Sequence, residues 1–326
     1  MPWEVRPVTT VEYDFDPELA AAIPVLPVLD VSDLPAARAT LTELRDQLPA
    51  PDETGVTVTE VRVPGPEGAP DVPLRIYRPD VPAGPVGIYD VHGGGFIMGD
   101  LDGSHAANVA IARSVGAVLV TVDYRLAPEH RFPAGLEDCY AGLVWFAEHA
   151  EEYGVDPDRI AIHGISAGGG LCAALALLAR DRGGPAIAFQ YLGVPEVDDR
   201  LETPSMRAFT DTPIWNRPNA VVSWDSYLGE GVRGTNEVSP YAAPARATDL
   251  AGLPPAYVSV MAFDPLRDEG IAYALALQAA GVPVELHLFP GTFHGSSLIE
   301  DATISKREAA ERVAVLRQAL DLPRGD

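Results

Sequence analysis

Apolar and polar positions divide most of the chain into strand-like and helix-like runs. Residues 117–124 are apolar at nearly every position, which is typical of a strand buried on both faces of a parallel sheet. The pattern predicts strands at 56–63, 74–77, 86–91, 117–124, 159–162, 186–194, 256–262 and 284–289. It predicts helices at 36–48, 135–153, 171–180, 268–280 and 304–320. Because strands and helices alternate, we expect an α/β fold whose mainly parallel sheet is covered by helices on both faces.

Residues 200–246 interrupt this alternation with many prolines, with large aromatic residues that include Trp215, Trp224 and Tyr227, and with no strand pattern. Loops of this length usually have a function or carry structure of their own. Together with residues 1–50, this segment is expected to form a cap over the carboxyl edge of the sheet, where open α/β sheets bind ligands. An ordinary surface excursion is the alternative. The expected organisation is a cap segment at 1–50 and a main domain at 51–326, with the second cap segment at about 200–246.

The composition is that of a globular protein, with 47% hydrophobic and 21% charged residues. The formal net charge of −24 argues against nucleic acid and anionic membranes as partners, because both would be repelled. It favours neutral or cationic small molecules, although acidity that serves only solubility is an equal alternative.

Two cysteines, Cys139 and Cys172, lie in apolar helix-like segments, which favours buried free thiols over a disulfide or a metal site. Residues 1–6 contain no basic stretch followed by an apolar core, so we expect no signal peptide. No run reaches the roughly 18 apolar residues of a membrane-spanning helix. A cytoplasmic location is therefore expected.

The sequence Gly164-Ile165-Ser166-Ala167-Gly168 joins a strand-like run to a helix-like run. A serine in G-x-S-x-G at such a junction is held on a tight turn and presented as a nucleophile. A glycine-rich turn with a chance serine is the alternative. A base, an acid and an oxyanion site at suitable positions would decide between the two.

The base must follow the nucleophile in the chain order of this arrangement, which is Ser, then Asp or Glu, then His. Only His287 and His294 lie beyond Ser166. His287 falls inside the last predicted strand, where a partly buried structural residue is expected. His294 lies five residues past the end of that strand, in a loop at the solvent edge where an imidazole could face the serine. His294 is the preferred base.

Asp264 is the preferred acid, because it leaves the strand at 256–262 at its carboxyl end. Asp268 and Glu269 follow at a helix start, where acidic residues are expected to complement the helix dipole. Glu285, in the last strand, is a weaker rival.

An oxyanion site is predicted at His92-Gly93-Gly94-Gly95-Phe96, directly after the strand at 86–91. Consecutive glycines let backbone N–H groups approach a tetrahedral intermediate, and the N–H of Ala167 would complete the hole. The glycine spacing fits neither common phosphate-binding pattern, so a nucleotide site is not expected.

With these motifs, the chain resembles the hormone-sensitive-lipase-like branch of the α/β-hydrolases, the bacterial family IV carboxylesterases. The resemblance covers most of residues 70–320 and rests on six stretches: 92–96 (HGGGF), 123–129 (DYRLAPE), 132–138 (FPAGLED), 166–169 (SAGG), 264–270 (DPLRDEG) and 293–295 (FHG). It implies an eight-stranded, mainly parallel sheet with a cap. It also implies a triad of Ser166, Asp264 and His294 and an oxyanion hole made by Gly94, Gly95 and Ala167. No metal or organic cofactor is implied, and a homodimer is a further option.

The sequence departs from the family pattern in a few places. Ile165 stands before the nucleophile, where relatives usually carry an acid, and Glu196 and residues 261–263 are also unusual. Natural divergence and deliberate alteration of the pocket both account for such changes. Residues expected near the substrate pocket are His92, Phe96, Ile165, Glu196 and Trp215. Glu196 is either a carboxylate in the acyl pocket or a solvated residue at a strand end.

The predicted function is hydrolysis of short-to-medium acyl carboxylic esters through an acyl-enzyme. An amidase or acyltransferase would use the same triad. A ligand-binding protein on the same scaffold, like the gibberellin receptors of plants, is disfavoured because serine, acid and base are all present.

Overall fold

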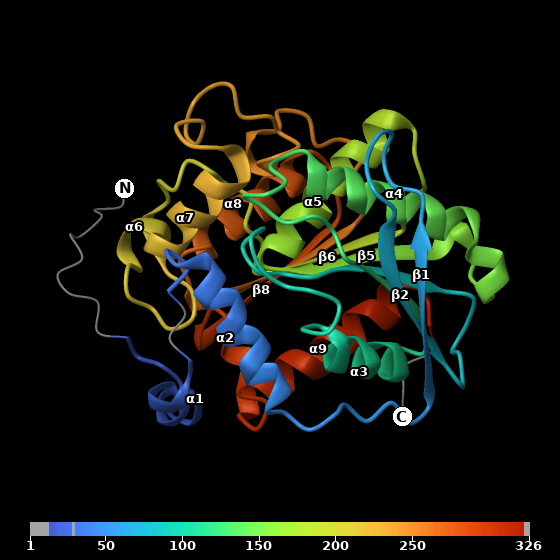
Figure 1. Ribbon diagram of the computed structural model, residues 1–326, viewed down its shortest axis with the longest axis horizontal. Helices are drawn as coiled ribbons and strands as arrows, with labels where there is room; N and C mark the ends of the chain where they lie inside the picture. The colour runs from blue at the N-terminus through green and yellow to red at the C-terminus, as the bar shows by residue number, and fades with distance from the viewer. Residues whose placement is uncertain (1–12, 28–29, 323–326) are drawn as a thin grey trace.

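A single sheet of eight strands organises the computed structural model, which describes residues 13–27 and 30–322 (Figure 1). The strand order is β1-β2-β4-β3-β5-β6-β7-β8. The strands are β1 Val56–Val63, β2 Val72–Pro79, β3 Gly87–Val91, β4 Val118–Val122, β5 Ile160–Ile165, β6 Phe189–Gly193, β7 Ala256–Phe263 and β8 Val284–Phe293. β1 and β2 pair antiparallel and β2 pairs antiparallel with β4, whereas every pair from β4 to β8 is parallel. The predicted fold class is confirmed.

Helices cover both faces of the sheet. They are α1 Pro17–Ala22, α2 Leu34–Asp46, α3 His105–Val115, α4 Ala134–Glu148, α5 Ala167–Arg182, α6 Pro204–Ala208, α7 Arg217–Leu228, α8 Arg267–Ala279 and α9 Thr303–Ala319. α4, α5 and α8 enclose the larger core on one face, and α3 and α9 enclose a second core on the other (Figure 1). The central strands β3, β4 and β6 are buried at every position, which explains their mainly apolar sequences.

Two differences in element boundaries from the sequence-based expectation affect the site. α5 begins at Ala167, four residues earlier than predicted, because its glycines pack at the helix start instead of forming a loop. β8 continues to Phe293, past the predicted end at Phe289, after a register irregularity opposite β7. The helices α1, α3, α6 and α7 were not predicted. Both cysteines are buried free thiols, as expected.

Two segments lie against the loops at the carboxyl ends of the strands. In the first, which directly precedes α1, Phe15 packs on Phe263 and Phe293 at the ends of β7 and β8. In the second, which contains α6 and α7, Ser223 of α7 hydrogen-bonds to the carbonyl of Gly95 in the loop after β3, at 2.7 Å. The edge of the sheet where the predicted site residues lie is thus covered from two sides.

No helix in residues 13–27 and 30–322 is long and apolar enough to cross a membrane. The expectation about a signal peptide concerns residues 1–6, which lie outside the described residues.

Candidate active site

Ser166 occupies the sharp turn between β5 and α5 with φ 61° and ψ −126°. A non-glycine residue with positive φ is strained and needs support from its surroundings. Its N–H donates to the Gly193 carbonyl at 2.8 Å, and its own carbonyl accepts from Gly170 at 3.0 Å and from Glu196 at 3.2 Å. These three hydrogen bonds fix the turn and aim the hydroxyl, as in the strained strand-to-helix turns that present a nucleophilic serine.

The structure brings Ser166, His294 and Asp264 together from β5, from the end of β8 and from the end of β7. His294 Nε2 lies 2.9 Å from Ser166 Oγ, and His294 Nδ1 lies 2.7 Å from Asp264 Oδ2. Because the Asp264 carboxylate only accepts, Nδ1 carries the proton and Nε2 is free to accept from the serine hydroxyl. Asp264 Oδ1 also accepts from the Leu266 N–H at 2.9 Å, which locks the carboxylate in place.

The position of His294 differs from the prediction in one respect. It was expected in a loop at the solvent edge, yet it follows β8 directly and is only 7% exposed. Trp215 lies beside it, with ring centroids 5.9 Å apart. The base therefore works in a largely water-excluded environment, where its hydrogen bonds are stronger than in water.

The rival residues have other partners. His287 interacts with Glu311 of α9 on the outer part of β8 and is partly buried, as predicted. Glu285 is exposed on β8. At the start of α8, Asp268 accepts from Ser205 N and Glu269 accepts from Val197 N. The preferences for His294 and Asp264 thus agree with the geometry.

The glycine loop after β3 lies against the nucleophile turn. A Cβ added to Gly93 would lie 2.7 Å from the Ile165 carbonyl oxygen and 3.3 Å from Ser166 Cβ, so a larger residue would push the loop away. The carbonyl of Gly94 accepts from Ile97 and Met98 N–H groups, which closes the loop into a tight turn. Ala167 is the first residue of α5, where backbone N–H groups lack intrahelical partners and the helix dipole favours negative charge. The loop and the helix start together can hold an oxyanion.

Three predicted pocket residues are arranged around this loop. His92 stacks on Tyr124, and its Nδ1 donates to the Gly93 carbonyl at 2.8 Å. Burial lowers the pKa of His92, so this imidazole is neutral and structural. Phe96 stacks on Tyr227 of α7 with centroids 4.2 Å apart. Trp215 reaches the loop as well, because a Cβ on Gly95 would lie 2.5 Å from its indole ring.

Ile165 packs into an apolar cluster instead of facing a charged group. The cluster contains Val194, Met261 and Phe289, with Ile304 of α9 packed against it. Two of the unusual positions in the sequence, Ile165 and Met261, therefore meet in one place. An acidic side chain there would have only apolar neighbours in this cluster, so packing accounts for the isoleucine.

Glu196 is fully buried, which excludes a solvated residue at a strand end. Its Oε1 lies 3.2 Å from Ser223 Oγ, and its Oε2 has no hydrogen-bond partner among the described residues. Burial raises the pKa of Glu196 to about 8, with the charge of Asp264 adding to the effect and the hydrogen bond to Ser223 opposing it. Ser223 was missed by the sequence analysis, because no motif marks a serine inside a helix.

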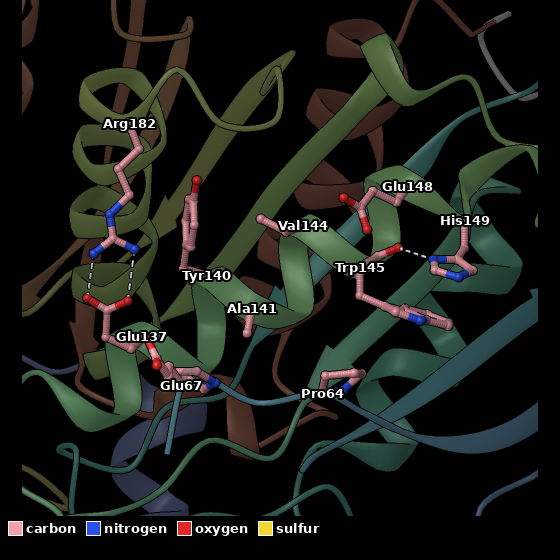
Figure 2. A pocket seen from close by; sticks show the side chains of 11 residues that line it. Pro64, Glu67, Glu137, Tyr140, Ala141, Val144, Trp145, Glu148, His149 and Arg182 are labelled. Carbon is pink, nitrogen blue, oxygen red and sulfur yellow. Dashed lines mark hydrogen bonds and ion pairs between the residues drawn. The ribbon is translucent and has the colours of Figure 1, made fainter. Parts of the chain in front are cut away.

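A surface hollow of about 610 Å³ lies on the solvent-facing side of α4 (Figure 2). Tyr140, Val144 and Trp145 line it together with the ion pair between Glu137 and Arg182. None of the predicted site residues borders it. Within the described part of the chain, no group of three or more His, Cys, Asp or Glu residues could hold a metal ion.

Comparisons with known proteins show similarity in sequence and in fold. A family model described as alpha/beta hydrolase fold matches residues 88–298. The chain is 41% identical to carboxylesterase NlhH of Mycobacterium tuberculosis, over 96% of this chain and 98% of the relative. It is also 41% identical to esterase LipI of the same organism, over 86% of this chain and 87% of the relative. A solved bacterial heroin esterase is 52% identical with a TM-score of 0.90, covering 94% of this chain and 98% of that one. All three names describe esterases, and none supports the amidase, acyltransferase or receptor alternatives.

Proposed function

Because the chain belongs to the alpha/beta hydrolase fold family, in its hormone-sensitive-lipase-like branch, and is a carboxylesterase, we propose that Ser166 is its nucleophile. The observation that carries this proposal is the continuous chain of contacts from Ser166 Oγ through His294 to Asp264, at 2.9 Å and 2.7 Å. Nucleophile, base and orienting acid are thereby aligned as acyl transfer requires.

The reaction takes place in two halves. His294 Nε2 accepts the hydroxyl proton as Ser166 Oγ attacks the ester carbonyl, and the resulting imidazolium is stabilised by the Asp264 carboxylate. The tetrahedral oxyanion is held by the N–H groups of Gly94, Gly95 and Ala167, each contributing about 3 kcal/mol to lowering the barrier. The imidazolium then protonates the leaving alcohol, and the acyl group stays on Ser166. Water, deprotonated by His294, releases the carboxylic acid by the same route.

We propose that residues 1–50 and about 200–246 form a cap of the substrate pocket over the catalytic domain. Ser166 is only 7% exposed, and Trp215 contacts both the oxyanion loop and the ring of the base. A pocket walled this closely favours short-to-medium acyl groups. The name of the bacterial heroin esterase supports a small-molecule ester as the substrate.

The remaining features of the proposal concern partners and location. The net charge of −24 supports small neutral or cationic esters as substrates, with neither nucleic acid nor an anionic membrane as a partner. Two buried free thiols fit the reducing cytoplasm. β8 ends the sheet with Leu286 and Leu288 exposed, which supports a homodimer formed at this edge and measurable by light scattering.

Replacing Ser166 by alanine tests the proposal. Hydrolysis of p-nitrophenyl butyrate is expected to fall by about 10⁶-fold, towards the rate that binding and the oxyanion hole alone provide. The matched control is Ser259→Ala, which removes another buried serine from β7 and should leave the rate close to that of the wild type. A Ser166→Ala protein with the parent rate would exclude Ser166 as the nucleophile. Labelling by an organophosphate should modify one residue per chain, and the modified peptide should contain Ser166.

A further inference from the structure

Glu196 connects the nucleophile turn to the oxyanion loop. Its backbone N–H donates to the Ser166 carbonyl, and its side chain reaches Ser223 on α7. The same Ser223 hydroxyl lies 2.7 Å from the carbonyl of Gly95. Glu196 and Ser223 are both fully buried, so water does not compete for these contacts.

Hydrogen-bond counting assigns the protonation state of this pair. The Ser223 hydroxyl has one proton to donate, whereas the Gly95 carbonyl and an ionised Glu196 can only accept. If Glu196 were ionised, either its carboxylate or the Gly95 carbonyl would therefore have no hydrogen-bond donor. A protonated Glu196 donates to Ser223 Oγ and frees the serine proton for Gly95, so that both contacts are satisfied.

We infer that Glu196 acts as a positioning residue: as a neutral carboxylic acid, it donates to Ser223, which in turn donates to the Gly95 carbonyl and holds the oxyanion loop. This role rests on the proposed function, because Gly95 is one of the proposed oxyanion donors. Fixing the carbonyl of Gly95 restricts the backbone rotation of that residue and so fixes the direction of its N–H. Oxyanion donors lower the barrier only when they are aimed in advance at the developing charge.

Burial, together with the charge of Asp264, raises the pKa of Glu196 and keeps it neutral near pH 7. Asp264, after β7, contributes a negative charge that opposes ionisation of Glu196. Burial raises the pKa of Glu269 on α8 well above its usual range, and it also raises the pKa values of Tyr124 and Tyr227. The two tyrosines therefore stay neutral across the range in which Glu196 ionises.

Ionisation of Glu196 should then weaken catalysis. Above about pH 8, its carboxylate takes the Ser223 proton, the Gly95 carbonyl loses its donor, and a negative charge lies behind the oxyanion site. We expect kcat of the wild type for p-nitrophenyl acetate to fall along an alkaline limb centred near pH 8, with KM changed less than twofold. An effect on kcat at constant KM indicates an interaction made in the transition state.

Two variants separate this role from a purely structural one. Glu196→Gln keeps an N–H donor for Ser223 but cannot ionise, so we expect kcat at pH 7 within about threefold of the wild type and no alkaline limb. Ser223→Ala should lower kcat about tenfold at every pH, because the Gly95 carbonyl has lost its donor. It should also flatten the alkaline limb, because ionised Glu196 then has no Ser223 proton to take from the Gly95 carbonyl.

Glu269→Gln is the matched control, because it replaces another buried carboxyl group, whose hydrogen bonds go to Val197 N and Asp198 N and not to Ser223 or the oxyanion loop. The alkaline limb should persist in this variant. An unchanged limb in Glu196→Gln, or wild-type kcat in Ser223→Ala, would overturn the role of Glu196. Organophosphate labelling should remain stoichiometric in every folded variant. If the organophosphate failed to label Ser166 of the wild type, the result would refute Ser166 as the nucleophile and not the role of Glu196.

Discussion

Replacing Glu196 by glutamine should change how stability depends on pH. The folded protein buries this carboxyl group in its neutral form, whereas the unfolded chain ionises it above its ordinary pKa of 4.5. Folding therefore takes up a proton between pH 4.5 and about pH 8. Because folding raises the pKa of Glu196, the protonated carboxyl group contributes to stability in full below pH 4.5. This contribution of Glu196 is lost as pH rises towards 8. Glutamine has no proton to take up, so the variant lacks this loss.

The size of the effect follows from the two pKa values. Each pH unit between them changes the unfolding free energy by about 1.4 kcal/mol, which amounts to about 5 kcal/mol over the whole interval from 4.5 to 8. Relative to the wild type, Glu196→Gln should thus gain about 3 kcal/mol between pH 5.5 and pH 8. Glu196 is fully buried, so screening by solvent does not reduce this figure.

Urea unfolding followed by tryptophan fluorescence, at several pH values from 5.5 to 9, measures this difference. Starting at pH 5.5 keeps the protein away from its sequence pI of about 4.5. Val197→Ala is the control, because it removes a fully buried side chain from the same segment without changing an ionisable group. It should lower the unfolding free energy by about 2 kcal/mol at every pH. A difference between wild type and Glu196→Gln that stays constant from pH 5.5 to pH 8 would refute a neutral, buried Glu196.

Three further substitutions test the site. Asp264→Asn should lower kcat by about 10⁴-fold with little change in KM, because an amide at this position no longer selects the tautomer of His294 that accepts the serine proton. Steady-state kinetics measure this loss, and a fall in kcat of less than tenfold would contradict the role of Asp264. Gly94→Ala should lower the unfolding free energy by roughly 3 kcal/mol in urea, because a Cβ at φ +116° would lie 2.1 Å from the Met98 carbonyl oxygen. Ile165→Asp should cost a similar amount, roughly 3 kcal/mol, by placing a carboxylate in an apolar cluster, and wild-type stability would contradict that account.

The sequence was sufficient to predict the eight strands, because six of them, β2 to β7, carry apolar residues buried on one or both faces of the sheet. The end of β8 was misjudged because Pro290 and Gly291 read as a break in the chain. β8 is an edge strand, where proline is tolerated, and Phe293 pairs with Phe263 beyond the irregularity. Sequence pattern alone does not contain this long-range pairing.

The helix α7 escaped prediction for a different reason. Its buried positions include Asn219 and Ser223 as well as Ala220, Trp224 and Tyr227, so its inner face is partly polar and the apolar periodicity is weak. The residues that obscured the helix are the ones that the site uses. Ser223 donates to the Gly95 carbonyl in the loop after β3, and the Asn219 side chain donates to the Ile214 carbonyl next to Trp215.

The triad was predictable because the G-x-S-x-G motif and the order of the later acid and base restrict the choice to a few residues. The pairing of Glu196 with Ser223 was not, because the two residues lie 27 positions apart in a segment without a motif. Glu196 attracted notice only as an unusual residue, and the sequence does not say whether its side chain points to substrate, solvent or core. The fold decides this by placing the residue behind the nucleophile.

The two carboxyl groups of this core are useful because they hold opposite charge states. Asp264 must be ionised to orient His294 and stabilise its imidazolium, whereas Glu196 must be neutral to donate to Ser223. The negative charge of Asp264 itself helps to raise the pKa of Glu196, so ionising the first favours protonation of the second. Pairs of titratable groups whose surroundings drive their pKa values apart divide acid and base roles in many active sites. By the same division, the ionised carboxyl group of Asp264 would serve the base, and the neutral carboxyl group of Glu196 would serve the oxyanion loop. Both roles would depend on the buried negative charge of Asp264, which orients His294 and helps to keep Glu196 neutral.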